Sequence, residues 1–252
     1  MDNEEITLDD ILKNTFSKTC ISLAGEILSK KRPGFNLNKN NYDLLSENEI
    51  YIMESFYILS DIENCLSSIN NAFIFMNQPN NNQLLWQYSI NIVDYSMYHY
   101  DMICYKIVSI RDLYFKLINQ VYKLKMSDKD CKWNNINKKK DEIANPRLFE
   151  ILDSYYNNFK NIIEVRNKSA HNGKIEHLAW KQISPYMLIR QYNTDTVLHS
   201  WIENQLKNGQ KKFIDEMKIY RYNSFSLTRC VLCILSNKFI DSINTEIKQN
   251  TI

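Results

Sequence analysis

One short segment, Arg166-Asn167-Lys168-Ser169-Ala170-His171, combines residue types that could do acid–base chemistry. Arginine is permanently charged and carries a planar fork of N–H donors. Histidine has an unperturbed pKa of about 6.5, so it exchanges protons near neutral pH. With a polar amide directly after the arginine, the segment forms a compact group that is cationic and able to transfer protons. The rest of the chain has the pattern of a helical scaffold.

The segment closes a predicted amphipathic helix over residues 146–171. Asn145 is a good N-cap and Pro146 is favoured at the first helical position, whereas Asn172-Gly173 tolerates the left-handed geometry that ends helices. The next step of the helix's apolar stripe falls on Arg166, so the pattern predicts a charged guanidinium on the inward or partner-facing side. The stripe steps by 4, 3, 4 and 3 residues through Leu148, Leu152, Tyr155, Phe159 and Ile162.

A guanidinium on that side needs a compensating group, because an unpaired buried charge is costly. The charge could be compensated by a carboxylate on the same helix such as Glu164, by a carboxylate from another helix, or by water if the arginine side chain extends to solvent at the helix end. A fourth alternative is a polar crevice in which the arginine binds an anion. His171 lies about 140° from Arg166 around an ideal helix, so the two diverge unless the last turn unwinds. A second subunit could bring in a matching pair.

The composition favours an all-α protein. Of 252 residues 44% are hydrophobic, and only 4 are Gly and 4 are Pro, which leaves long segments without turn residues. The formal net charge of +2 neither indicates nor excludes a nucleic-acid binder. The six cysteines are scattered, the N-terminus lacks an apolar region, and no stretch reaches the roughly 18 apolar residues of a membrane helix. We expect a cytoplasmic protein without a membrane partner.

Apolar periods and turn signals predict an α-helical bundle of about six or seven helices. They cover residues 7–30, 49–76, 83–125, 146–171, 175–183, 196–220 and 226–247, and a polar segment over 127–145 carries a short helix. The Asn-rich loop behind Pro33-Gly34 marks a boundary between an N-terminal extension over residues 1–47 and a main helical domain over residues 48–252. The 83–125 helix contains an unbroken seam at Ile103, Ile107, Ile110, Tyr114, Leu117, Val121 and Leu124.

Other reactive groups have structural interpretations. Cys230 and Cys233 have the spacing of a metal or redox pair, but their run is apolar and lacks a second pair, so we interpret them as buried apolar residues. His99, His177 and His199 lack the neighbouring ligands of a metal site. We therefore predict no metal and no cofactor.

Some residues fit both a structural and a functional interpretation. Arg111-Asp112 is either a salt bridge or part of a groove, and Lys138-Lys139-Lys140 is either a solvated loop or an attractor of RNA. Four tyrosines could stack on bases, although aromatic residues at helical spacing also form cores and interfaces. They are Tyr95, Tyr98, Tyr100 and Tyr105.

The pattern Arg166-Asn167-x-x-x-His171 resembles the Arg-x4–6-His motif of the HEPN superfamily (higher eukaryotes and prokaryotes nucleotide-binding domain), in which a polar residue follows the arginine. Members are small α-helical bundles, usually dimeric, with the motif on a late helix. Many are metal-independent endoribonucleases of toxin–antitoxin, antiviral and RNA-processing systems. The helical context over residues 83–247 supports the resemblance.

The resemblance implies that Arg166 and His171 are catalytic and that Asn167 orients them. Metal-free RNA cleavage needs a group that manages the proton of the 2′-hydroxyl or of the leaving oxygen, and a cation at the phosphorane oxygens. Lys168, like Arg166, would contact RNA. Some toxin-type relatives carry a tyrosine two residues after the histidine, which an antitoxin nucleotidyltransferase modifies, and here that position is Gly173.

Two hypotheses follow. The first is a dimeric endoribonuclease that cuts RNA by attack of the 2′-hydroxyl, in a toxin–antitoxin or antiviral setting and with an antitoxin or regulatory protein as a possible partner. The second is a non-catalytic module that binds RNA, a nucleotide or a protein through the same groove. The sequence contains no Gly-rich phosphate-binding loop and no nucleophile elbow. These absences argue against a P-loop nucleoside triphosphatase and against a hydrolase with a serine nucleophile elbow.

Overall fold

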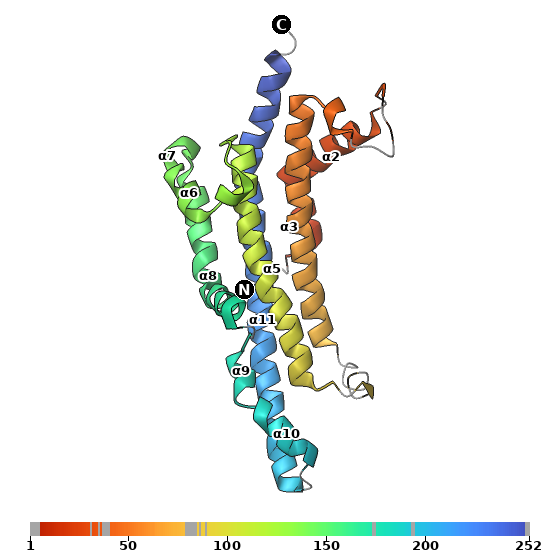
Figure 1. Ribbon diagram of the computed structural model, residues 1–252, viewed down its shortest axis with the longest axis vertical. Helices are drawn as coiled ribbons and strands as arrows, with labels where there is room; N and C mark the ends of the chain where they lie inside the picture. Colours follow the sequence, from red (N-terminus) through yellow and green to blue (C-terminus); the bar gives the residue numbers. More distant parts are fainter. Residues whose placement is uncertain are drawn as a thin grey trace. The chain divides into compact units, whose positions relative to one another are not determined.

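The computed structural model describes residues 6–30, 32–34, 36, 41–78, 85, 87–88, 90–172, 175–192 and 195–249, with backbone only for residues 170–172, 188, 190–192 and 246–249. Throughout these residues the chain forms helices joined by short connections and no β-strand (Figure 1). The prediction of an all-α fold is confirmed. None of the described helices is both long and apolar enough to cross a membrane.

In the described part of the chain, six helices have nine residues or more, in agreement with the predicted six or seven. They are α2 (Thr15–Ser29), α3 (Glu47–Asn77), α5 (Ile92–Val121), α8 (Pro146–Asn172), α10 (Ser184–Tyr192) and α11 (Thr196–Gln249). Shorter elements lie between them: α1 (Leu8–Leu12), α6 (Trp133–Lys138), α7 (Lys140–Ile143), α9 (Leu178–Lys181) and the 3-10 turns Tyr42–Leu44 and Asp128–Asp130.

Two predicted helices differ from the structure because an asparagine side chain caps a new helix start within each of them. The predicted helix over residues 7–30 is divided into α1 and α2 at Asn14, whose side chain accepts a hydrogen bond from the Phe16 N–H at 2.9 Å. The predicted 83–125 helix begins only at Ile92, since Asn91 accepts from the Asp94 N–H at 2.9 Å. It ends at Val121, ahead of Lys123 with φ of 52°.

The C-terminal third also departs from the prediction. Ser184-Pro185 does end the helix before it, but it also begins α10, because proline is tolerated in a first helical turn. The two helices predicted over 196–220 and 226–247 are one continuous helix, α11. The polar residues between them are paired instead of forming a turn: Ser224 Oγ donates to the Tyr220 carbonyl at 2.8 Å, and Arg221 Nε donates to Asn70 at 2.8 Å.

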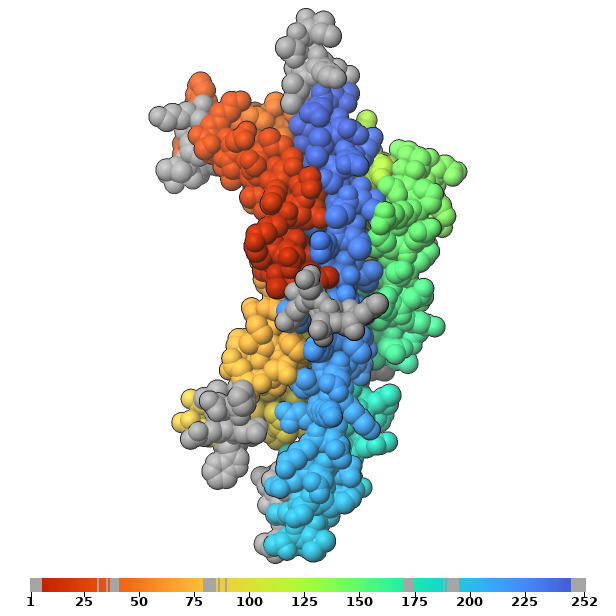
Figure 2. Space-filling view, turned by 180° about the vertical axis from the view of Figure 1, so that it is seen from behind, coloured from red at the N-terminus to blue at the C-terminus, as the bar shows by residue number. Residues whose placement is uncertain are grey.

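The chain divides into two compact units. Unit 1 comprises Met1–Cys65, Ser109–Tyr155 and Phe225–Ile252, and unit 2 comprises Leu66–Val108 and Tyr156–Ser224. In unit 1 the N-terminal helices lie against the C-terminal part of α11 (Figure 2), where the rings of Phe16 and Phe239 are 4.7 Å apart. The predicted division into an extension over residues 1–47 and a domain over residues 48–252 stays a prediction.

The predicted apolar seams are buried. Along α5 and just beyond it, Ile103, Ile107, Ile110, Tyr114, Leu117, Val121 and Leu124 are all at most 6% exposed. In unit 1, the Tyr114 hydroxyl shares a 2.6 Å hydrogen bond with Thr228, which satisfies a polar group inside the seam.

The prediction that Cys230 and Cys233 are buried is wrong. Cys233 is exposed and its sulfur accepts a hydrogen bond from Asn14 Nδ2 at 3.0 Å, whereas Cys230 is half-buried. The helical period explains this outcome, because Val231, Leu232 and Leu235 occupy the inward face of α11.

A network around Glu49 at the start of α3 predicts a pH-dependent stability. Burial raises the pKa of Glu49, but hydrogen bonds from the Ser46 N–H, Arg32 and Lys30 outweigh it and lower the pKa from 4.5 to about 2. The carboxylate therefore stabilises the fold above pH 4.5, and this contribution is lost as the pH falls toward 2. We expect Glu49→Gln to lower the free energy of unfolding by about 1 to 2 kcal/mol at pH 7 in urea titrations.

The difference between wild type and Glu49→Gln should shrink as the pH falls below 4.5. Exposed Glu54 on the same helix provides the control, since Glu54→Gln should change the free energy by less than about 0.5 kcal/mol at any pH. A Glu49→Gln effect that is equally large at pH 3 and pH 7 would contradict the assignment.

Candidate functional site

Helix α8 carries the candidate segment as the sequence predicts. Its apolar stripe is buried: Leu148, Leu152, Tyr155, Phe159 and Ile162 are all at most 4% exposed. The next position of the stripe is Arg166, which is half-buried. The same periodicity that builds the core thus brings the guanidinium to the edge of that core.

The contacts of Arg166 lie within unit 2. Its Nη1 donates to the Asn167 side-chain oxygen at 3.3 Å, and its Cζ lies 5.6 Å from the centre of the Tyr105 ring on α5. Its Nε is buried and has no hydrogen-bond partner among the residues that the structure describes. A buried donor without a partner costs about 1 to 3 kcal/mol, so this residue is held at an energetic cost.

No described carboxylate forms an ion pair with Arg166. Glu164, the carboxylate considered on the same helix, is exposed and does not contact it. The guanidinium is instead held by an amide oxygen and an aromatic face, which together leave its positive charge uncancelled. Of the alternatives drawn from the sequence, a polar site for an anion agrees best with these contacts.

The contact with Tyr105 could not be found by reading α8 alone. Tyr105 was one of four tyrosines considered for base stacking, but its pairing with Arg166 depends on how α5 and α8 pack within unit 2. The buried residues Cys104 and Ile107 fix the face of α5 that Tyr105 presents, and Tyr105 stays 42% exposed. The Tyr105 ring therefore contacts the guanidinium of Arg166 and is also partly accessible to solvent.

Asn167 and Lys168 are both exposed and are accessible to a substrate. Ser169 is 5% exposed, and its hydroxyl donates to the Arg166 carbonyl at 3.1 Å. Asn167 contacts Arg166 directly, which agrees with an orienting role, whereas Lys168 makes no such contact.

His171 belongs to the last turn of α8, which continues to Asn172. Its side chain, like Gly173, lies outside the described part of the structure. Because the backbone stays helical through His171, positions 166 and 171 project about 140° apart. The helix does not unwind before His171, so a single copy of α8 directs positions 166 and 171 to different sides.

Two other histidines of unit 2, His177 and His99, lie among structural contacts. His177 caps α9: its Nδ1 accepts from the Ala179 N–H at 3.1 Å, and its Nε2 contacts Glu216 at 3.1 Å (Figure 1, α9 beside α11). This hydrogen bond lowers the pKa of Glu216. His99 is 8% exposed among aromatic rings, and burial lowers its pKa. Both ring nitrogens of His177 are therefore occupied, whereas Nδ1 of His99 is buried without a hydrogen-bond partner among the described residues.

The sequence interpretation of Arg111-Asp112 as a salt bridge is confirmed, with 2.9 Å between the two side chains. Both residues belong to unit 1. Within the described residues, no group of three or more His, Cys, Asp or Glu side chains is arranged to hold a metal ion.

A family model described as Cthe2314-like HEPN matches residues 42–224. This range is more than half of the chain and includes the whole segment from Arg166 to His171. No curated protein and no solved structure gives a match to the chain.

The energetics of Arg166 can be tested by replacing it with an apolar residue of similar length. Because its Nε is buried without a partner, we expect Arg166→Met to leave the free energy of unfolding unchanged or to raise it by up to about 2 kcal/mol. Urea titrations followed by circular dichroism measure this difference.

Arg221 provides a matched control in the same unit. It is 9% exposed, its Nε donates to Asn70 at 2.8 Å, and its Cζ lies 5.6 Å from the Phe73 ring. Arg221→Met should lower the free energy of unfolding by about 1 to 3 kcal/mol, since it leaves buried polar groups without a partner. An equally large loss in Arg166→Met would show that Arg166 serves stability.

Proposed function

This chain belongs to the Cthe2314-like HEPN family, and from this membership we propose that it is a metal-independent endoribonuclease with Arg166 and His171 as its catalytic residues. The observation that carries the proposal is the guanidinium of Arg166, which is half-buried, lacks a carboxylate partner and is held by Asn167 and Tyr105. Such a cation suits a phosphodiester.

Arg166 stabilises the charge that develops during cleavage. Attack on phosphorus places negative charge on the non-bridging oxygens of a phosphorane. A guanidinium presents parallel N–H donors to two oxygens at once, and the stabilisation is larger at a partly desolvated site than in water. Tyr105 restricts the guanidinium from one side, so less reorganisation is needed when the substrate binds.

His171 manages the proton. The 2′-hydroxyl oxygen attacks the adjacent phosphorus, the bond from phosphorus to the 5′-oxygen breaks, and the products are a 2′,3′-cyclic phosphate and a 5′-hydroxyl. One proton leaves the 2′-hydroxyl and one reaches the 5′-oxygen. An imidazole titrating near neutral pH performs either transfer, for which positioned groups contribute about 100- to 10,000-fold. Lys168 attracts the flanking phosphates.

The active form contains two copies of the chain. Positions 166 and 171 project about 140° apart on α8, so a symmetric pair of α8 helices brings Arg166 of one copy toward His171 of the other. Each dimer then holds two composite sites. In the cell the enzyme acts in a toxin–antitoxin or antiviral defence setting under the control of an antitoxin or another regulatory protein.

A cleavage assay in excess EDTA tests the activity. The substrate is a fluorescently labelled single-stranded RNA that contains all four bases. We expect wild-type protein to cut it, and we expect His171→Ala and Arg166→Ala each to lower the rate at least about 100-fold. Asn167→Ala should retain part of the activity, since it only orients Arg166.

Three controls separate this activity from contamination. His199→Ala changes a histidine of α11 and should cut at the wild-type rate. The same substrate with 2′-deoxyribose throughout should stay intact, because it lacks the nucleophile. Mass spectrometry should find cyclic phosphate ends. Binding of RNA without cleavage, weakened by Arg166→Ala, would instead support the second hypothesis, a non-catalytic binding module.

Mixed dimers test the composite site. Arg166→Ala and His171→Ala chains with different affinity tags are coexpressed, and dimers that carry both tags are purified. One of their two composite sites then combines an intact Arg166 with an intact His171, so we expect about half of the wild-type rate. Each variant alone should remain inactive.

An inactive mixed dimer would place both catalytic residues of a site on one chain. That result would reject the composite site and leave the ribonuclease activity itself standing. Light scattering of the purified wild type measures the oligomeric state independently.

A further inference from the structure

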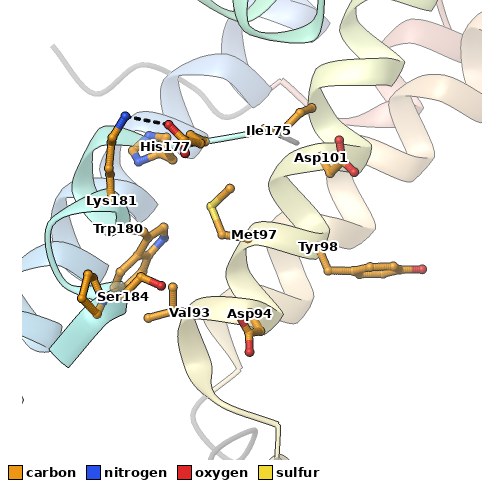
Figure 3. Close-up of a pocket in the computed structure, with 12 residues that line it drawn as sticks. Val93, Asp94, Met97, Tyr98, Asp101, Ile175, His177, Trp180, Lys181 and Ser184 are labelled. Carbon is orange, nitrogen blue, oxygen red and sulfur yellow. Dashed lines mark hydrogen bonds and ion pairs between the residues drawn. The ribbon is translucent and has the colours of Figure 1, made fainter. Parts of the chain in front are cut away.

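A pocket of about 600 Å³ lies in unit 2, separate from Arg166 and unused by the proposed reaction. One wall is the first part of α5 and the other is the segment from Ile175 to Pro185, which carries α9 and the start of α10 (Figure 3). On α5 the lining residues Asp94, Met97, Tyr98 and Asp101 stand at positions i, i+3, i+4 and i+7, so they share one face over about 10.5 Å.

The charged groups of the pocket leave one carboxylate without a partner. Lys181 is paired with Glu176 at 2.8 Å, as Figure 3 shows, and both ring nitrogens of His177 have partners. Asp94 accepts a hydrogen bond from Asn91. Asp101 remains: its Oδ1 is buried without a hydrogen-bond partner. Burial raises the pKa of this carboxyl, as expected for a negative charge that nothing neutralises.

A second polar group in the pocket is also unsatisfied. Trp180 is 1% exposed, and its indole N–H is buried without a partner. Figure 3 draws the indole nitrogen on the edge of the ring that faces Met97. Buried indole N–H groups usually have an acceptor, so this donor points to a ligand atom that accepts a hydrogen bond.

The sequence holds Trp180 in place through a close helix contact. A Cβ added to Gly209 on α11 would lie 2.7 Å from Ile183 Cδ1 and 3.3 Å from the Ala179 carbonyl oxygen. A larger residue at position 209 would displace the Ile183 side chain and press on the Ala179 carbonyl, so glycine favours this close approach of α11 to the segment around Trp180. The Trp180 ring also contacts Phe213, at 5.6 Å between centres.

We infer that this pocket binds a small organic amine whose ammonium group pairs with Asp101. Its body lies against Met97, Val93 and Trp180, and an acceptor atom takes the Trp180 N–H. A cation is favoured because neither Asp101 nor Asp94 has a cationic partner among the described residues, and their negative charge disfavours phosphates and carboxylates. Tyr98, 73% exposed at the rim, offers an aromatic face to an approaching cation. The inference does not depend on the ribonuclease proposal.

Four probes with a similar body test the inference by titration calorimetry on the wild-type chain. Tyramine carries an ammonium and a hydroxyl acceptor, phenethylamine lacks the hydroxyl, 4-ethylphenol lacks the charge, and 3-(4-hydroxyphenyl)propionate reverses it. Tyramine should bind most tightly and the propionate not measurably. Asp101→Asn keeps the shape and removes the charge, and it should weaken tyramine at least tenfold.

Asp215→Asn makes the same change at an exposed position of α11 outside the pocket and should leave tyramine binding unchanged. The unfolding temperature of Asp101→Asn should match or exceed that of wild type, because the half-buried carboxylate has no cationic partner among the described residues. Failure of tyramine to bind, equal affinity for the propionate, or unchanged affinity in Asp101→Asn would each overturn the inference.

Discussion

The central constraint is the charge of Arg166 at the end of a buried apolar stripe. Helix α8 is amphipathic, and the period that buries Phe159 and Ile162 also carries position 166 to the core edge. A leucine or methionine there would extend the core. The guanidinium instead leaves a buried Nε without a partner, and the contact with Tyr105 returns only about 0.5 to 1 kcal/mol at a partly exposed site. The choice of residue is therefore explained by an anionic ligand better than by stability.

The continuity of α8 bears on whether Arg166 and His171 of one chain can form one site. Since α8 is helical through Asn172, the directions of positions 166 and 171 are set by the 3.6-residue period. A break one turn earlier could have allowed a site within one chain. A helical backbone through Asn172 directs the two positions apart, and a two-fold related copy is the simplest way to bring them together. The helix geometry thus supports the composite site that we propose.

The sequence predicted those features that local signals determine. The Asn145-Pro146 start and Asn172-Gly173 stop gave the bounds of α8 nearly to the residue, since capping acts within one turn. The sequence-based prediction was wrong where a short polar side chain can either cap a new helix or hydrogen-bond within an existing one. Asn14 and Asn91 cap new helices, whereas Ser224 donates to a carbonyl of its own continuous helix. The partner of Arg166 and the pocket could not be predicted, because both depend on contacts between helices distant in sequence.

Arg166 and Asp101 carry charges of opposite sign that no ion pair compensates among the described residues of unit 2, and their separation is informative. Asp101 lies one helical turn before Tyr105 on α5, so the carboxylate and the ring that holds Arg166 share a helix face. An ion pair between Asp101 and Arg166 would have satisfied both charges and stabilised the unit, yet the structure contains none between them. We propose a separate ligand for each charge: a phosphodiester at the cation and an amine at the carboxylate. The opposite charges would then keep each proposed ligand from the other site.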